Sequence, residues 1–126
     1  MTALNRTGSR IAVELELLGA TDVTDFGLLG HAWEMAGASG VGMHIHLRDV
    51  PLMEGARACA GQRLFPGGSY YNRDYYSPNV RFTDDISEED RMLLLDAQTS
   101  GGLLLAVPPD KPDRLVDRLA ADGQPG

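Results

Sequence analysis

The sequence contains almost no cysteine or lysine and no long apolar run. Cys59 is the only cysteine among the 126 residues, which excludes an intrachain disulfide framework and a cysteine-rich zinc module. Lys111 is the only lysine, and no glycine-rich loop precedes it, which excludes a P-loop nucleotide site. No apolar run approaches the roughly 20 residues that span a bilayer. We therefore expect a protein of the reducing cytoplasm with no membrane partner.

Basic charge is also scarce. The chain has 18 acidic and 11 basic residues, a net charge of −7. A nucleic-acid partner is disfavoured, because phosphate neutralisation needs a basic face. The apolar fraction of 43% and the charged fraction of 23% are ordinary for a folded domain. The length predicts one domain over residues 1–126.

Apolar periodicity and helix-stop residues predict helices interspersed with three or four strands, without strict strand–helix alternation. That mixture favours the α+β class. Gly40 and Gly123 are expected helix stops, and Ser87 with Asp90 has the spacing of a capping box. The expected helices are 2–15, 26–38, 52–60, 87–95 and 110–123, and the expected strand segments are 19–27, 41–47 and 103–107.

The segment from Gly61 to Asn79 is rich in glycine and proline and predicts a long irregular loop. Its tyrosines could stack on a base, but their irregular spacing favours anchoring of the loop. They are Tyr70, Tyr71, Tyr75 and Tyr76.

Two carboxylates lie in the stretch from Thr21 to Gly27, between an expected strand and an expected helix. Mg²⁺ takes one or two protein carboxylates and completes its shell with phosphate oxygens and water, so Asp22 is a candidate metal ligand. The alternative is that Asp22, Thr24 or Asp25 caps the helix, which such side chains do often. Both hold if Asp25 caps and Asp22 stays free.

A second candidate site runs from Asp96 to Gly102. Glycines at 101 and 102 allow a ligand to approach the backbone, and Thr99 and Ser100 offer hydroxyl groups. The alternative is a plain helix-to-strand loop with a glycine C-cap.

The remaining ligand types give weaker signals. His44 and His46 share one face of the expected strand, so they form a metal pair that His31 would complete, or they face solvent. A packed, unreactive thiol is the favoured interpretation of Cys59, because only Arg57 lies near enough in sequence to lower its pKa.

Several stretches together resemble the C-terminal domain of the selenophosphate synthetase (selenide, water dikinase) family, within the aminoimidazole ribonucleotide synthetase-like superfamily. The family pattern is close to TDVTGFGLLGH near the start and DPQTSGGLL near the end. The matching stretches are TDVTDFGLLGHAWEMA, SGVGMHIHLRDVP, PGG, the Asn-x-x-Tyr at Asn72–Tyr75, and LLDAQTSGGLLLAVP.

The resemblance implies a mixed or antiparallel sheet packed with helices, in an enzyme that makes selenophosphate, AMP and phosphate from ATP, selenide and water. Asp22 matches a metal-binding aspartate of the family, so Mg²⁺ and ATP are the implied cofactors. Thr99, Ser100, Gly101 and Gly102 match a motif near the active cleft.

The resemblance also implies that the nucleophile, the essential lysine and most ATP-binding aspartates belong to an N-terminal domain that this chain lacks. No catalytic residue is therefore expected here. The implied form is a homodimer, and an uncovered strand edge near the end of the chain leads us to expect self-association. The alternative is an inactive, stand-alone binding or assembly module that keeps the fold.

Two residues depart from the family pattern. Asp25 replaces a glycine, which would strain the backbone if that position has a positive φ. Ala97 replaces a proline, which is expected to loosen the start of the second motif.

Overall fold

The computed structural model describes residues 5–123, which form two compact units. Unit 1 contains residues 5–23 and 100–123, and unit 2 contains residues 24–99. The chain therefore passes between the units twice, once in each candidate motif: between residues 23 and 24, and between residues 99 and 100. We describe each unit by itself. In the described part of the chain, no helix has the length and apolar character to cross a membrane.

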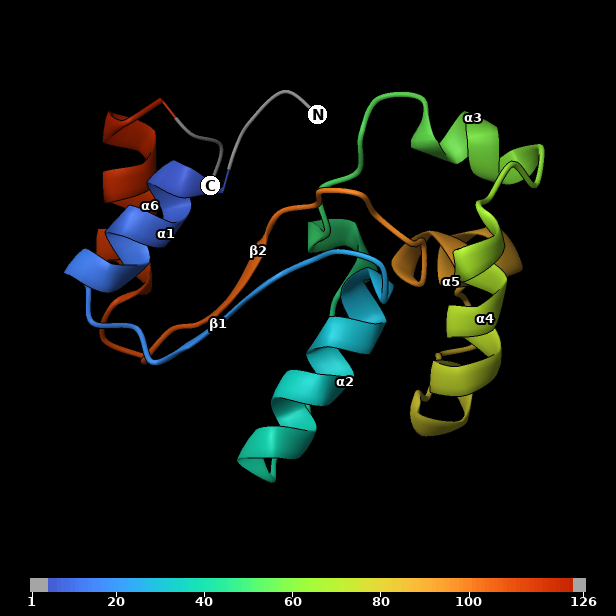
Figure 1. Ribbon diagram of the computed structural model, residues 1–126, viewed down its shortest axis with the longest axis horizontal. Helices are drawn as coiled ribbons and strands as arrows, with labels where there is room; N and C mark the ends of the chain where they lie inside the picture. Colours follow the sequence, from blue (N-terminus) through green and yellow to red (C-terminus); the bar gives the residue numbers. More distant parts are fainter. Residues whose placement is uncertain (1–4, 124–126) are drawn as a thin grey trace. The chain divides into compact units, whose positions relative to one another are not determined.

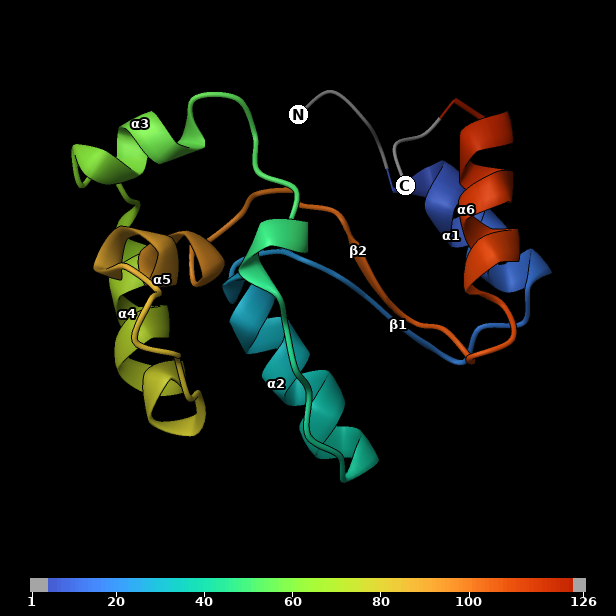
Figure 2. The ribbon, with the colours of Figure 1, turned by 180° about the vertical axis from the view of Figure 1, so that it is seen from behind.

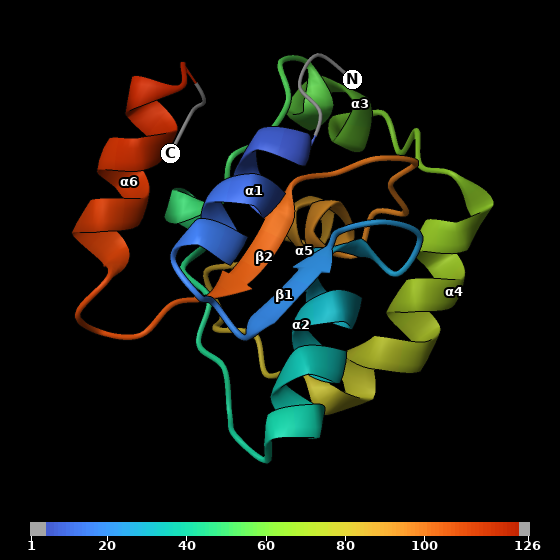
Figure 3. The same cartoon turned by 60° about the vertical axis from the view of Figure 1, so that its left-hand side comes forward.

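Unit 1 is a two-stranded antiparallel ribbon with two helices (Figure 1). The strands run in opposite directions with Gly19 opposite Ala106 and Asp22 opposite Leu103 (Figure 3). A Cβ on Gly19 would lie 2.8 Å from that of Ala106, so the ribbon needs a glycine there. The elements are α1 (Arg6–Glu14), β1 (Gly19–Asp22), β2 (Leu103–Ala106) and α6 (Pro112–Ala121).

The core of unit 1 is aliphatic. Ile11, Leu15 and Leu115 are buried together and join α1 to α6. Lys111, the single lysine, lies at the start of α6, and its Nζ donates to the carbonyl oxygen of Leu15 at 2.7 Å. It thereby satisfies one of the carbonyls that the end of α1 leaves without a helical partner.

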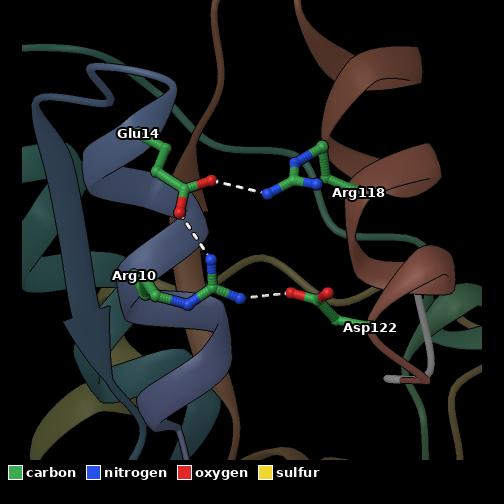
Figure 4. A network of polar contacts seen from close by, with 4 residues as sticks. All are labelled: Arg10, Glu14, Arg118 and Asp122. Atoms are coloured by element: carbon green, nitrogen blue, oxygen red, sulfur yellow. Dashed lines mark hydrogen bonds and ion pairs between the residues drawn. The ribbon is translucent and has the colours of Figure 1, made fainter.

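Four charged side chains also connect α1 and α6 (Figure 4). Glu14 accepts a hydrogen bond from Arg118 at 2.7 Å and another from Arg10, which also pairs with Asp122. These bonds hold the pKa of the Glu14 carboxyl below its ordinary value of 4.5, with Arg118 the larger cause. The same pairing with Glu14 and Asp122 raises the pKa of Arg10.

Unit 2 is helical, with α2, α4 and α5 around its core (Figure 1). Leu29, Tyr76, Leu94 and Leu95 are buried together there. Burial raises the pKa of the Tyr76 phenol, and the nearby Glu34 carboxylate adds to the effect. The elements are α2 (Gly27–Ser39), η1 (Leu47–Asp49), α3 (Ala56–Gly61), α4 (Gly67–Tyr76), η2 (Ser77–Asn79) and α5 (Glu88–Leu94).

The α+β class and the antiparallel sheet are confirmed. The stop at Gly40 is confirmed, since its φ of 64° ends α2 in the left-handed region. Gly123 follows α6 with a φ of 70°. The cap at Ser87 is also confirmed, because its hydroxyl accepts from the backbone N–H of Asp90 at 3.1 Å.

Other element predictions are wrong. Residues 41–46 form no strand and run back from α2 as an extended segment toward η1 (Figure 2), so residues 5–123 contain two strands. The expected loop 61–79 instead contains α4 and η2. Pro66 lies immediately before the first turn of α4, where a proline does not interrupt a helix. Asp110 does not cap α6; Lys111 is its N-cap residue and makes no side-chain cap. The expected helix 2–15 begins at Arg6, and residues 2–4 lie outside the described residues.

We predict that Glu14→Gln lowers the melting temperature at pH 7, because a neutral amide loses both charge-assisted bonds. The carboxylate stabilises the folded state fully above pH 4.5, and this contribution disappears as pH falls through its lowered folded pKa. The difference between the native chain and the variant should therefore shrink below pH 4.5 in thermal melts. Asp117→Asn, which changes an exposed acid on the partner helix α6, is the control; an equal loss in both variants would contradict the prediction.

Candidate functional site

Asp22 occupies the last position of β1, where its side chain is exposed. The ribbon continues past it. The N–H of Val23 donates to Gly102 at 2.9 Å, and the N–H of Gly101 donates to Val23 at 2.8 Å. Because Asp22 pairs with Leu103, the structure brings it beside the glycine pair of the second motif. The two motifs are therefore neighbours in unit 1.

The two glycines of this loop have different roles. A Cβ on Gly101 would lie 2.6 Å from the carbonyl oxygen of Val23, so the ribbon can close only with glycine at this position. A Cβ on Gly102 would meet nothing within 4 Å. Space is therefore open above the backbone at Gly102, next to the strand position that pairs with Asp22.

The donor set fits Mg²⁺ in one respect. The Asp22 carboxylate is exposed, and none of the described residues donates a hydrogen bond to it. Mg²⁺ is usually held by one or two carboxylates and keeps its waters or substrate phosphates in the other positions. Within residues 5–123, no group of three or more histidine, cysteine, aspartate or glutamate side chains surrounds a common point. Asp22 would thus serve as a single ligand beside open space.

The other halves of the motifs meet in unit 2. The N–H of Gln98 donates to the carbonyl oxygen of Thr24 at 3.1 Å. Gly27 begins α2 with a φ of 69°, and a Cβ there would lie 2.7 Å from the carbonyl carbon of Leu95. Only a glycine accommodates both this conformation and this approach.

A buried amide on α4 joins these two chain segments. The Nδ2 atom of Asn72 donates to the carbonyl oxygens of Asp25 at 2.6 Å and Leu95 at 3.0 Å. Asn72 is only 7% exposed. In the sequence, Asn72 stands out only through the family resemblance, because it lies in a segment expected to be a loop and no local pattern indicates its burial.

Ser69 on α4 fastens the start of the second motif. Its hydroxyl donates to Oδ1 of Asp96 at 2.8 Å and accepts from the N–H of Ala97 at 3.0 Å. Gln98 donates from Nε2 to the other oxygen of Asp96 at 2.8 Å. A proline at position 97 has no N–H to donate. The expected loosening at Ala97 is therefore offset by a hydrogen bond that the family's proline could not make.

The proposed caps of α2 are not observed. Phe26 is the N-cap residue, and no side chain makes a cap hydrogen bond. The turn is instead held by His31, whose Nε2 accepts from the N–H of Thr24 at 3.0 Å. Asp25 has no positive φ, so its replacement of a glycine strains nothing. The glycine C-cap proposed for the second motif is wrong too, since α5 ends at Leu94 with Leu95 as its C-cap.

The other candidate residues, a cysteine, three histidines, four tyrosines and two hydroxyl residues, lie in different surroundings. Cys59 is exposed, so the expectation of a packed thiol is wrong. His31 is engaged by Thr24 and does not complete a metal site with His44 and His46. The tyrosines lie on α4: Tyr76 is buried, whereas Tyr70, Tyr71 and Tyr75 are exposed. Thr99 and Ser100 are exposed, at the point where the chain passes from unit 2 to unit 1.

Comparisons with known proteins agree on one family. The family model described as AIR synthase related protein, C-terminal domain, matches residues 4–125. A selenide, water dikinase of Carboxydothermus hydrogenoformans is 43% identical over 98% of this chain and 36% of its own length. A selenide, water dikinase of Pelobacter propionicus is 45% identical over 98% of this chain and 35% of its own. The chain spans about a third of the length of these relatives.

We predict that Asn72→Ala lowers the free energy of unfolding by about 2 kcal/mol, because two carbonyl groups lose their donor. The measurement is urea unfolding followed by far-ultraviolet circular dichroism. Tyr71→Ala on the same helix, where the side chain is 79% exposed, should change stability by less than about 0.5 kcal/mol. Equal effects of the two substitutions would show that the Asn72 amide does not hold the segments at Asp25 and Leu95 together.

Proposed function

Because the chain belongs to the family of AIR synthase related protein C-terminal domains, we propose that it acts as the C-terminal domain of a selenide, water dikinase. The observation that carries this proposal is the pairing of the two motifs, which sets the exposed Asp22 carboxylate beside the open backbone at Gly102. The proposed reaction converts ATP, selenide and water into selenophosphate, AMP and phosphate. The proposed compartment is the cytoplasm, and the proposed assembly of the complete enzyme is a homodimer.

Asp22 is the proposed metal ligand of this domain. Mg²⁺, when bound with ATP, neutralises charge on the transferring phosphoryl group. Asp22 would supply one hard oxygen ligand, and its position in the hydrogen-bonded ribbon would fix where that oxygen lies. One carboxylate makes a weak site by itself, so the remaining ligands would come from the nucleotide and from the N-terminal domain.

The loop from Thr99 to Gly102 is the proposed wall of the nucleotide cleft. Hydroxyl groups of Thr99 and Ser100 are exposed, and Gly101 and Gly102 present backbone without side chains. Such a segment can approach phosphate oxygens closely. Gly101 is required by its approach to Val23, whereas Gly102 leaves the space that a ligand could use.

We predict that this chain by itself does not form AMP from ATP in a selenide-dependent way. Phosphoryl transfer needs a nucleophile, metal ligands and positioned cations together. The chain's one lysine is instead bound to Leu15, and its exposed Cys59 lies on α3. The measurement is ³¹P NMR of the purified chain with Mg²⁺, ATP and selenide. Selenide-dependent AMP would contradict the prediction and favour a complete active site within this chain.

We also predict that Asp22→Asn reduces turnover of a complete enzyme by on the order of 100-fold or more, because it weakens the binding of the Mg²⁺ that would neutralise the charge on the transferring phosphoryl group. The enzyme would be a chimaera that joins this chain to the N-terminal part of the Carboxydothermus relative. Glu54→Gln, an exposed acid remote in sequence from both motifs, is the matched control and should keep full activity. Unchanged turnover in Asp22→Asn would contradict the metal-binding role of Asp22, whereas a native chimaera without turnover would favour the inactive binding module.

A further inference from the structure

The extended segment 41–46 connects α2 to η1 and, together with Leu47 at the start of η1, reads VGMHIHL, with apolar residues at alternate positions. Ile45 and Leu47 pack against the core of unit 2 beside Leu29 and Tyr76. In an extended chain, alternate side chains point to opposite faces. The intervening residues therefore face away from the core.

Those intervening positions include His44 and His46. Both side chains are exposed, and their ring centroids lie 4.6 Å apart. Zinc binds imidazole nitrogens at about 2.0–2.1 Å and prefers a tetrahedral shell. Two neighbouring imidazoles on one face can supply two of those four positions.

The backbone of this segment offers a place for a second chain. The N–H groups of residues 42–46 donate to no backbone or side-chain acceptor within residues 5–123. His46 has extended dihedrals of −91° and 111°. An extended segment with open hydrogen-bonding groups is a template for strand addition.

The order of residues makes a second copy of this chain the fitting occupant. In an antiparallel register centred on Ile45, His44 of each copy lies opposite His46 of the other, so the four imidazoles share one face of the pair. Val41 is 60% exposed and Met43 is 44% exposed, so the part of the segment that precedes the histidines is open to an approaching chain. No acidic side chain lies between 41 and 47, although the whole chain carries a charge of −7. The segment itself therefore adds no negative charge that would repel a second copy.

We propose that His44 and His46 from two copies of this chain bind one zinc ion, while their extended segments 41–46 pair in antiparallel directions. The two copies together supply four imidazole nitrogens, which complete the tetrahedral shell. The site uses no residue assigned above to ATP or magnesium. Its failure in a test would therefore leave the proposed function untouched.

The test measures the molar mass of the untagged 126-residue chain by light scattering, in EDTA and then with zinc chloride. The expected result is a mass about twice that in EDTA, with about one zinc ion for two chains by titration calorimetry. Magnesium chloride should leave the mass unchanged, because Mg²⁺ prefers oxygen ligands.

The double substitution His44→Gln with His46→Gln should abolish the zinc-dependent doubling while the circular dichroism spectrum stays native. Cys59→Ser is the matched control, since it removes an exposed soft ligand outside the segment, and it should behave as the native chain. The proposal is overturned if zinc binds without a change in mass, if doubling persists in the double variant, or if Cys59→Ser abolishes it.

Discussion

The architecture of unit 2 depends on a close approach between the turn before α2 and the end of α5. The backbone at Gly27 lies so near the carbonyl group of Leu95 that no side chain fits between them. The carbonyl oxygens this approach buries need a donor, because an unpaired buried carbonyl is costly. The Asn72 amide supplies a hydrogen bond to each segment. The lack of a side chain at Gly27 and the buried amide of Asn72 therefore determine where α2, α4 and α5 meet.

Unit 1 meets a similar constraint with small residues. The two segments of the ribbon approach closely at Gly19 and again at Gly101, just before β2. An added Cβ would collide with Ala106 at the first position and with Val23 at the second. The ribbon has only two strands in the described residues, so its stability rests on the helices that pack beside it. Ile11 and Leu115 supply the apolar contact between those helices, and the charged network with Glu14 fixes their pairing at the surface. The position of Asp22 follows from this ribbon.

Local signals predicted what local interactions determine. The cap at Ser87 and the stop at Gly40 need only neighbouring residues, and both are confirmed. The strand expected at 41–47 failed because a strand also requires a partner, which no pattern within the segment can reveal. The helix α4 was missed because its glycines and tyrosines are poor helix formers, whereas burial of Ser69 and Asn72 provides the stabilisation. The neighbourhood of the two motifs likewise depends on long-range pairing.

The two departures from the family pattern have different physical consequences. Ala97 gains an N–H, and Ser69 accepts it, so the change is absorbed within the hydrogen-bond network. Asp25 contributes only its carbonyl oxygen to that network, and its carboxylate remains exposed. The replacement of a glycine by Asp25 therefore leaves the backbone of the turn unchanged and adds one negative charge to the first motif. Negative charge attracts divalent cations and repels a bare phosphate. The physical effect of this departure is thus electrostatic, whereas that of Ala97 is a change in hydrogen bonding.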